Sequence, residues 1–382
     1  RVQGPALALL AKREREIQNF KPEPYWQIFL LVKNSHELEV QFPKNIFDKN
    51  EAEKFLLLKG KKGVAKTEKE VKEIQPPPPF DLTTLQVEAY KFLGLTPAQT
   101  LQLTQNLYLA GLISYPRTAS QKLPPAIGYR NILKKLEESY PVSKYAKRSK
   151  PIEGKASDPA HPAIFPTGEK PENLSKIEQQ LYDLIVRRFI SCFAEDALVE
   201  YKVIRVNVDG KEFVVKGLQV RKKGWTEVYK VKFTERELPD LNGKIHVKDV
   251  RLDDKETQPP KRYSPASIVS ELAKRGLGTK GTRAMIIETL YKRGYVKDRQ
   301  ITVTDLGLVV EQALEKYCPL ILDEELTREF EDKIEYIQAI NEREKILAEE
   351  AKILEEAQKV LKKICAQFNE NEEKIGTELL TA

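Results

Sequence analysis

The 382-residue sequence is poor in the residues that build disulfide frameworks, zinc ribbons and membrane spans. Its three cysteines, Cys192, Cys318 and Cys365, lie far apart and form no Cys-x-x-Cys pair. This spacing argues against disulfides and zinc ribbons and for a reducing, cytoplasmic location. No apolar run approaches the ~20 residues of a membrane span, and no signal peptide is visible. We therefore expect no membrane partner.

Two further absences concern the start of the chain and its metal chemistry. The chain begins at Arg1, and its sole methionine is Met285. No Asp-x-Asp-x-Asp stretch occurs, and the acid-rich Asp253-Asp254 and Asp323–Glu325 are typical of a surface loop and a helix start. The sequence therefore predicts no metal ligands within this chain.

Charge is present in quantity but is unevenly distributed. The formal net charge is +7, yet residues 321–382 hold 9 basic and 17 acidic residues. The first 320 residues consequently carry +15. Such a basic body favours a polyanionic partner such as nucleic acid, although many basic proteins are merely soluble.

Two proline clusters, Pro76–Pro79 and Pro259-Pro260, predict domain boundaries, and the first forms a stiff connector. Residues 20–75 and 199–259 show strand patterns, and we expect Gly224–Tyr229 to continue the second of these. Because both stretches share this pattern, they are expected to form one domain that the intervening helical segment interrupts. The fold class is therefore α+β with several domains.

Helix signals fill the remaining stretches. Asp81, Thr96, Ser175 and Ser264 each stand where an N-cap is expected, ahead of an apolar periodic run. Residues 323–366 are acidic with apolar residues at helical spacing, and we expect the last dozen residues to be frayed.

The most informative stretch is Gly111–Ser120, a polar cluster that directly follows a helix. Pro116 fixes its own φ and biases Tyr115 toward an extended backbone, so the Tyr115 phenol and the Arg117 guanidinium are held in a set relation. A guanidinium favours phenolate and grips phosphate with two hydrogen bonds, which suits attack on a phosphodiester. The alternative is an ordinary Tyr-Pro turn with the arginine in solvent.

A second constellation surrounds His161, which lies between prolines in the segment Asp158–Gly168. An imidazole can donate to a phosphate or move a proton near neutral pH. From the residues alone, a capping or packing role is the alternative.

A helix from Pro265 to Gly276, a second from Thr282 to Arg293 and a short β wing over 295–304 predict a winged helix. Polar and basic residues cluster at the turn between the two helices, where helix N-terminal amides also favour phosphate. They are Lys274, Arg275, Lys280, Thr282 and Arg283.

Several of these motifs together resemble one family. The tyrosine motif Leu112–Thr118, the segments Phe80–Gln86 and Ala160–Thr167, and the Gly276-x-Gly278-x-x-x-Thr282 pattern resemble type IA DNA topoisomerases, most closely the archaeal topoisomerase I form. The first residues, Arg1–Leu10, are similar to a segment that follows the family's metal-binding domain. The resemblance covers roughly residues 1–340.

The resemblance implies a reaction and the residues that carry it. Tyr115 would form a 5′-phosphotyrosine link with one DNA strand, Arg117 would stabilise the transition state, and His161 would contact the phosphate. Strand passage and religation would then relax negative supercoils without ATP. The residues expected to contact DNA are Arg1, Gln3, Ser114, Lys122, Arg187, Lys280, Thr282 and Arg283.

The resemblance also implies an architecture, a toroidal core with winged-helix-like (CAP-like) domains and a β arch. The expected domains are a helical, winged-helix-containing one, a β arch, an active-site tyrosine domain and a C-terminal tail. They comprise, in that order, residues 1–19 with 260–366, 20–75 with 200–259, 76–199, and 367–382.

What the family would need beyond this chain is a Toprim domain that binds Mg²⁺. We expect the chain to be a fragment that lacks this domain, cleaves DNA poorly without it, and pairs with a separate Toprim-containing segment on single-stranded or negatively supercoiled DNA. Two alternatives stay open: a non-catalytic DNA-binding clamp in which Tyr115 is structural, and a different tyrosine nuclease or recombinase, of which a recombinase makes a 3′ link.

Overall fold

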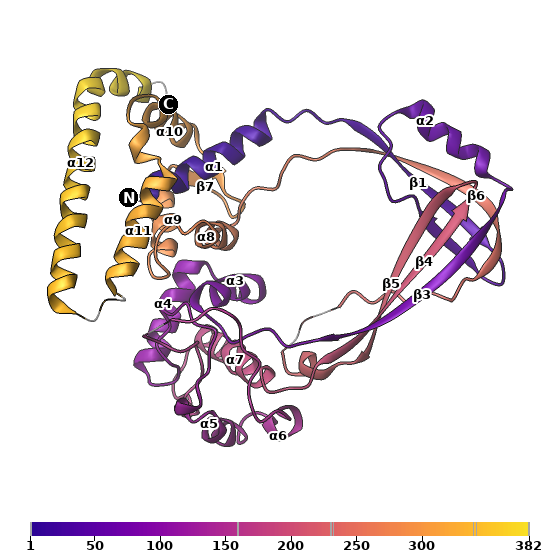
Figure 1. Cartoon of the computed structure of the whole chain (residues 1–382), viewed down its shortest axis with the longest axis horizontal. Helices are drawn as coiled ribbons and strands as arrows, with labels where there is room; N and C mark the ends of the chain where they lie inside the picture. Colours follow the sequence, from indigo (N-terminus) through magenta and orange to yellow (C-terminus); the bar gives the residue numbers. More distant parts are fainter. Residues whose placement is uncertain are drawn as a thin grey trace.

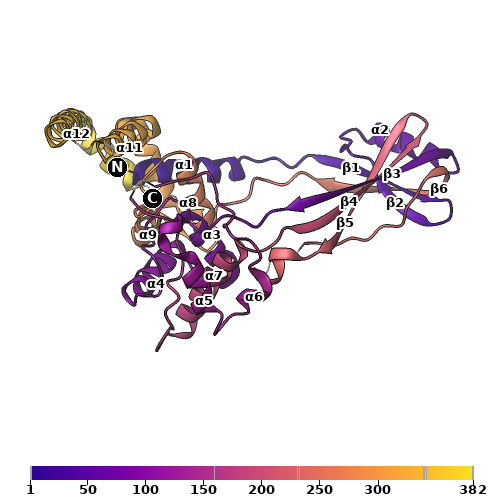
Figure 2. The same ribbon diagram turned by 60° about the horizontal axis from the view of Figure 1, so that its bottom comes forward.

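The computed structural model describes residues 2–158, 160–229, 231, 233–338, 340 and 342–380. Its ribbon follows a ring, with helices on one side and a β-barrel on the other (Figure 1). Seen after a 60° turn, the barrel stands at the end of long extended connections, well away from every labelled helix except α2 (Figure 2). Within the described residues, no helix is both long enough and apolar enough to span a bilayer.

Six antiparallel strands close the barrel in the order β1-β2-β5-β4-β3-β6. Alternate residues point inward to a core that includes Ile28, Leu30, Ile204 and Phe213. The strands are β1 Pro24–Lys33, β2 Glu37–Gln41, β3 Lys62–Ile74, β4 Ala197–Val208, β5 Lys211–Lys222 and β6 Gly243–Glu256. The two strand-rich segments of the sequence thus share one sheet, because β1 pairs with β6 and β3 with β4. A short helix, α2 Lys49–Glu53, packs beside β1.

The helices that follow β3 form the tyrosine lobe, which we define as residues 76–196 and 223–229. Its helices are α3 Leu82–Leu93, α4 Pro97–Leu109, α5 Tyr129–Leu136, α6 Val142–Tyr145 and α7 Lys176–Ser191. They surround one apolar core in which Phe80, Leu107 and Phe189 are buried. The expected caps are present, since Asp81, Thr96 and Ser175 each accept a hydrogen bond from the third helical N–H.

The expectation that Gly224–Tyr229 continues the strand pattern is wrong. Residues Gly224–Glu227 form a 3₁₀ turn, and Trp225 and Tyr229 are buried in the core of the tyrosine lobe. The Trp225 indole donates to the Ile74 carbonyl at 2.8 Å. Gly224 has φ +52°, and a side chain there would collide with the carbonyl of Asp196. A buried indole with a satisfied N–H therefore ends the strand.

The remaining helices form the terminal lobe, which we define as residues 2–18 and 264–380. It contains α1 Gln3–Gln18, α8 Pro265–Lys274, α9 Arg283–Lys292, a two-stranded sheet of β7 Val296–Lys297 and β8 Thr302–Val303, and α10 Asp305–Tyr317. The predicted helix, turn, helix and β wing are therefore present. Helix α1 joins their core through Leu7 and Leu10. Its Glu14 is 3% exposed and accepts two bonds from Arg262, at 2.6 and 3.1 Å.

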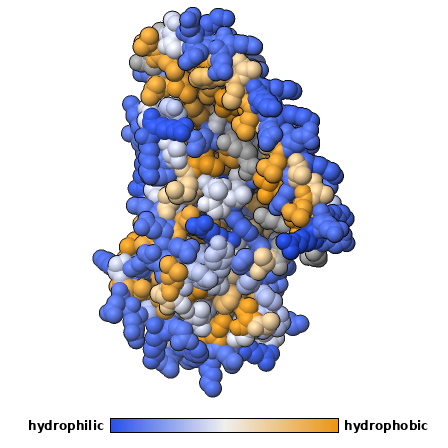
Figure 3. All heavy atoms as spheres, turned by 90° about the vertical axis from the view of Figure 1, so that its left-hand side faces the viewer, coloured by the Kyte–Doolittle hydropathy of each residue, from blue (hydrophilic) through white to orange (hydrophobic). Residues whose placement is uncertain are grey.

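Two further helices, α11 Glu324–Gln338 and α12 Arg343–Leu379, form a hairpin at the outer end of the terminal lobe (Figure 1). The expectation of a frayed end is wrong, because α12 runs on to Leu379. Its last turns are held by the buried Ile375 and by Glu378, which pairs with Lys316 at 2.6 Å. Figure 3, which faces this end, shows apolar patches among charged side chains.

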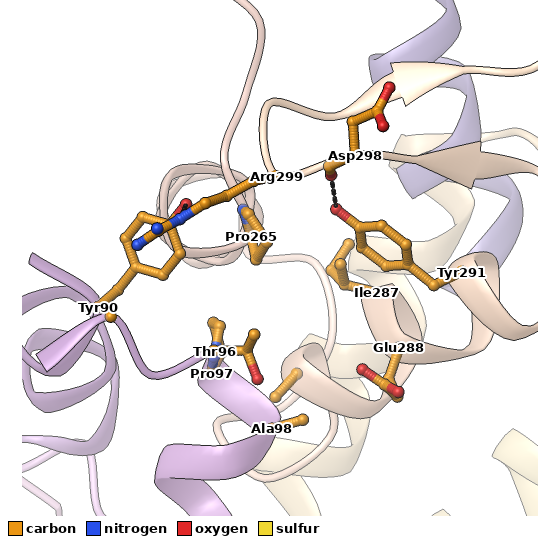
Figure 4. A pocket seen from close by; sticks show the side chains of 12 residues that line it. Tyr90, Thr96, Pro97, Ala98, Pro265, Ile287, Glu288, Tyr291, Asp298 and Arg299 are labelled. Carbon is orange, nitrogen blue, oxygen red and sulfur yellow. Dashed lines mark hydrogen bonds between the residues drawn. The ribbon is translucent and has the colours of Figure 1, made fainter.

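The two lobes touch where α3 packs on α8 and α4 on α9. A cavity of about 450 Å³ remains between them. The Arg299 guanidinium of the terminal lobe lies over the Tyr90 ring of the tyrosine lobe, 5.1 Å from its centroid, and donates to its hydroxyl at 3.1 Å (Figure 4). The contact between the lobes is thus partly open.

Candidate active site at Tyr115

The Tyr115 segment leaves α4 through a left-handed turn. Gly111 has φ +73°, which favours glycine, and the following Leu112 and Ile113 are buried in the core. The Leu112 N–H returns to the carbonyl of Leu107 at 3.0 Å. The backbone that enters Tyr115 is therefore anchored on its N-terminal side.

A second segment, residues 161–167, runs alongside and fixes this backbone. Ser114 donates its N–H to the Phe165 carbonyl at 2.9 Å. The Ser114 hydroxyl donates to the Ala163 carbonyl at 3.1 Å and accepts the Phe165 N–H at 3.0 Å. The hydroxyl that we expected on DNA thus joins two backbone segments.

The start of α3 completes the support. Phe80 accepts the Ile164 N–H at 2.7 Å, and the Leu82 N–H donates to Thr118 at 3.0 Å. Because Phe80 is fully buried, these backbone bonds connect both segments to the centre of the lobe core. The candidate site therefore lies on a rigid support, which catalysis by positioned groups requires.

This support brings the Tyr115 and His161 rings together. Their centroids are 4.8 Å apart with the planes inclined at 37°, and Tyr108 contacts Tyr115 edge-on at 5.4 Å. Tyr115 is half-buried, and its hydroxyl has no hydrogen-bond partner among the described residues. The Tyr115 ring is fixed by its aromatic neighbours while its hydroxyl oxygen has no partner in the described part of the chain, so a ligand from outside can reach that oxygen.

Asp158 lies behind His161 and connects several groups. Its Oδ1 is 3.9 Å from His161 Nδ1 and accepts the Ala160 N–H at 3.0 Å. Its Oδ2 accepts from the Ala119 N–H at 3.4 Å and from the Lys280 ammonium of the terminal lobe. Burial opposes ionisation, but Lys280 and the two N–H groups outweigh it, so the pKa of Asp158 lies below its ordinary value.

Arg117 extends toward the same part of the terminal lobe. Its guanidinium is exposed, and a Cβ built on Gly281 would lie 3.4 Å from Arg117 Cδ. Arg117 and Lys280 therefore both lie where the loop between α8 and α9 meets the Tyr115 segment. Two cations beside a tyrosine and an imidazole form a set of groups that fits a phosphodiester anion.

The next two predicted residues belong to that loop. The Thr282 hydroxyl accepts the Thr279 N–H at 3.0 Å and donates to the Thr279 carbonyl at 3.2 Å, so it closes the turn. Arg283 donates to the Leu277 carbonyl at 3.0 Å. Burial lowers the pKa of the Arg283 guanidinium, against the opposing charges of Glu331 and Asp81. Both residues shape the loop.

The remaining predicted DNA contacts lie elsewhere. Lys122 Nζ is 3.6 Å from a Glu153 oxygen. Arg187 pairs with Asp183 at 2.7 Å on the surface of α7. Gln3 lines an apolar cavity of about 520 Å³ that α12 helps to enclose. Arg1 lies outside the described residues.

The sequence interpretation missed two residues. Asp158 stands inside the motif that identified His161, but its partner Lys280 is 122 residues away, and no local pattern indicates that contact. Tyr108 lies in the last turn of α4, and its contact with the Tyr115 ring depends on the path of the chain after the Gly111 turn, which no local pattern displays.

The described residues contain no group of three or more His, Cys, Asp or Glu side chains placed to hold a metal ion. A Mg²⁺ site needs several oxygen ligands in octahedral geometry. Both carboxylate oxygens of Asp158 already accept hydrogen bonds, from Lys280 and from the N–H groups of Ala119 and Ala160. The side chains around Tyr115 therefore do not fit a resident metal, and no step below passes through one.

Comparison with known proteins gives a consistent result. A family model described as DNA topoisomerase matches residues 1–348. DNA topoisomerase 1 of Methanocaldococcus jannaschii is 44% identical over 100% of this chain and 51% of the relative, and that of Pyrococcus horikoshii is 45% identical over 99% and 57%. The solved structure of full-length topoisomerase I from Thermotoga maritima matches with a TM-score of 0.76 at 26% identity, over 95% of this chain and 62% of that one. The chain thus spans about half the length of these curated relatives.

Proposed function

The chain belongs to the DNA topoisomerase family, and we propose that it carries the tyrosine half of a type IA active site, with single-stranded DNA as its substrate. The observation that carries this proposal is the Tyr115 phenol, held between His161 and Tyr108 with its oxygen unpartnered among the described residues. An oxygen without a partner in the fold leaves the phenol available to a ligand.

The proposed step is a transesterification. The Tyr115 oxygen attacks a phosphorus of one strand, a new O–P bond forms, and the bond from phosphorus to the 3′ oxygen of the neighbouring nucleotide breaks. The phenol loses its proton and the departing 3′ oxygen gains one, so the products are a 5′-phosphotyrosine and a free 3′ hydroxyl. Religation reverses each change, and therefore no ATP is consumed.

Arg117 and His161 are proposed to act on the phosphate. Arg117 is exposed on the same segment as Tyr115, so its guanidinium can neutralise the charge that accumulates on the phosphoryl oxygens. The His161 ring faces Tyr115 at 4.8 Å, within reach of the same phosphate. Removal of either group is therefore expected to slow cleavage more than it weakens DNA binding.

The DNA path is also a proposal. Lys280 lies at the site, whereas Ser114, Thr282 and Arg283 support it through the loop and backbone bonds described above. Lys122, Arg187 and Gln3 would contact DNA only further along the path, and the contact expected of Arg1 stays a prediction. The ring-shaped chain path is compatible with a strand held inside it, with the two lobes separating to let a second strand pass and relax negative supercoils (Figure 1).

The finer architecture and the missing chemistry belong to the same proposal. We assign the barrel as the β arch and α8, α9 and the β wing as the winged helix. Mg²⁺ would be held by a Toprim domain outside the described residues, and a cytoplasmic location with the chromosome follows from a DNA substrate. The alternative, a DNA-binding clamp without cleavage, needs only the basic surface.

The test is an adduct-trapping assay. Labelled single-stranded DNA and Mg²⁺ are incubated with this chain, alone and with a Toprim-containing segment of a relative, and then denatured with detergent and alkali. We expect a 5′-linked covalent adduct that requires the added segment and is lost in Tyr115→Phe.

Tyr108→Phe is the matched control, because Tyr108 is an aromatic neighbour of Tyr115 with an exposed ring. It should retain the adduct. A 3′-linked adduct would favour a recombinase-like reaction. No adduct under either condition, with DNA binding unchanged by Tyr115→Phe, would leave the clamp.

A further inference from the structure

We propose that Asp158 is a positioning residue that fastens the terminal lobe onto the tyrosine lobe at the candidate site. Its carboxylate binds Lys280 across the interface and thereby holds the loop between α8 and α9 over the Tyr115 segment. The consequence for DNA cleavage rests on the proposed function, whereas the fastening itself does not.

The burial of Asp158 makes this pair different from ordinary surface pairs. The Asp158 side chain is 6% exposed, whereas the Lys280 side chain is 34% exposed. A carboxylate removed from water to this extent is costly unless its oxygens are satisfied. Both oxygens of Asp158 are occupied, by the N–H groups of Ala119 and Ala160 and by Lys280. Loss of Lys280 would leave a buried charge with two backbone N–H partners and the His161 ring at 3.9 Å.

The loop that presents Lys280 is itself rigid. Thr279 and Thr282 hydrogen-bond each other through hydroxyl and backbone groups on either side of Lys280. The backbone that carries the Lys280 ammonium is therefore a closed, hydrogen-bonded turn. A pair between a rigid turn and a buried acceptor fixes the distance between the two lobes at this point.

A second contact lies directly beside the first. Arg117 lies near Gly281, the residue that follows Lys280, since a Cβ added there would meet Arg117 Cδ at 3.4 Å. When Lys280 is held by Asp158, Arg117 is packed against the loop, next to the Tyr115 and His161 pair. Asp158 thus acts through Lys280 to place both cations around one point. Release of Lys280 would let the loop and Arg117 move apart.

A surface pair in the same lobe offers the comparison. Asp183 and Arg187 are about equally exposed, at 36% and 37%, and belong to one helix. Pairs of that kind contribute little and cannot hold two lobes together. Asp158 differs in its burial and in the lobe to which its partner belongs.

The experiment measures the separation of the lobes in the 382-residue chain without DNA. Spin labels are placed on exposed helical positions, one per lobe, by Arg130→Cys on α5 and Lys292→Cys on α9, in a Cys365→Ser background. Pulsed electron–electron double resonance then gives the distribution of distances between the two labels. In Asp158→Asn and in Lys280→Met we expect the separated population to rise on the order of tenfold, since a buried charge or its partner is lost.

The double variant distinguishes a fastening from two independent effects. Asp158→Asn with Lys280→Met should separate no further than either single variant, because both remove the same contact. Lys280→Arg retains the charge and should restore the closed distance, which a purely structural role of the lysine stem would not require. Asp183→Asn is the matched control and should leave the distribution unchanged.

Unchanged distances in Lys280→Met, or additive effects in the double variant, would overturn the proposal. If Asp158→Asn fails to fold, the comparison of Lys280→Met with Lys280→Arg decides alone, because Lys280 is partly exposed. The distances are measured without DNA, so the adduct assay can fail while the fastening holds, and the reverse.

Discussion

The Tyr115 segment contacts its two neighbours in different ways. Toward residues 161–167 of its own lobe it makes backbone hydrogen bonds over a buried core. Toward the terminal lobe it is connected by side chains: Asp158, which accepts the Ala119 N–H, binds Lys280, and Arg117 lies near Gly281. Backbone ladders over a core separate only when the lobe unfolds, whereas side-chain contacts can break and reform. The comparison indicates that the site is rigid within one lobe and separable between the two.

The largest expected effect comes from removing the centre of the rigid side. Phe80→Ala empties a fully buried ring position beneath both segments and should destabilise the tyrosine lobe by about 3–5 kcal/mol. Thermal denaturation would measure the loss of stability, and hydrogen exchange would show in which part of the chain it occurs. Phe47→Ala, at a ring that is 55% exposed on the barrel, should change stability by less than about 0.5 kcal/mol. Equal loss of protection in all parts would contradict a separate core.

A smaller effect is expected from one bond of the ladder. Ser114→Ala leaves the Phe165 N–H and the Ala163 carbonyl without their hydroxyl partner and should cost about 1–3 kcal/mol. Gly281→Ala, on the separable side, adds a Cβ at an ordinary 3.4 Å from Arg117 and should be nearly neutral. Chemical denaturation measures both variants, and a larger loss in Gly281→Ala would reverse the comparison.

Acid should act on the separable side first. The pKa of Asp158 lies below its ordinary value of 3.8, so its contribution is complete above about pH 4 and is lost as the pH falls through the depressed pKa. The charged and polar groups that face it are Lys280, His161 and the N–H groups of Ala119 and Ala160. The labelled chain should therefore keep its closed distance from pH 7 to 4 and lose it only at lower pH. Opening at pH 5–6 would assign the effect to another group.

The smallest expected effect is on the rate at which cysteines are alkylated, which reports whether the core of the tyrosine lobe opens. Cys192 is buried in the tyrosine core, and burial raises the pKa of its thiol to about 12, so it should resist alkylation at pH 8 while the exposed Cys365 reacts. Lys280→Met should leave Cys192 protected, because the lobes part without opening the core. Phe80→Ala should accelerate its labelling. Peptide mass spectrometry reads both sites, and exposure of Cys192 in Lys280→Met would join the two sides into one unit.

Local features of the fold could be predicted from the sequence because their causes lie within a few residues. The caps at Asp81 and Thr96 each depend on a residue three positions on, which the sequence displays directly. The strands of the barrel were also indicated, since each carries its own alternation. The end of β5 could not be predicted, because Gly224 packs against Asp196 and Trp225 hydrogen-bonds to Ile74, and both partners are distant in sequence.

The candidate site divides in the same way. Tyr115, Arg117 and His161 stand in short motifs, and the structure brings the Tyr115 and His161 rings to 4.8 Å while Arg117 lies near Gly281 of the terminal lobe. The pairing of Lys280 with Asp158 depends on how two lobes meet, and the neighbouring residues carry no trace of it. Arg187 has its own acid one helical turn away, and its contact with DNA stays a prediction.

The pairing of β1 with β6 has a consequence for synthesis. Strand β1 ends at Lys33 and its ladder partner β6 ends at Glu256, so the ribosome must release the whole tyrosine lobe before the barrel can close. At about 5–20 residues per second, this delay lasts roughly 10–45 s. During that time the nascent β1 exposes an apolar strand with an unpaired edge. Chaperones that shield such edges should therefore engage this chain while the inserted lobe folds behind it.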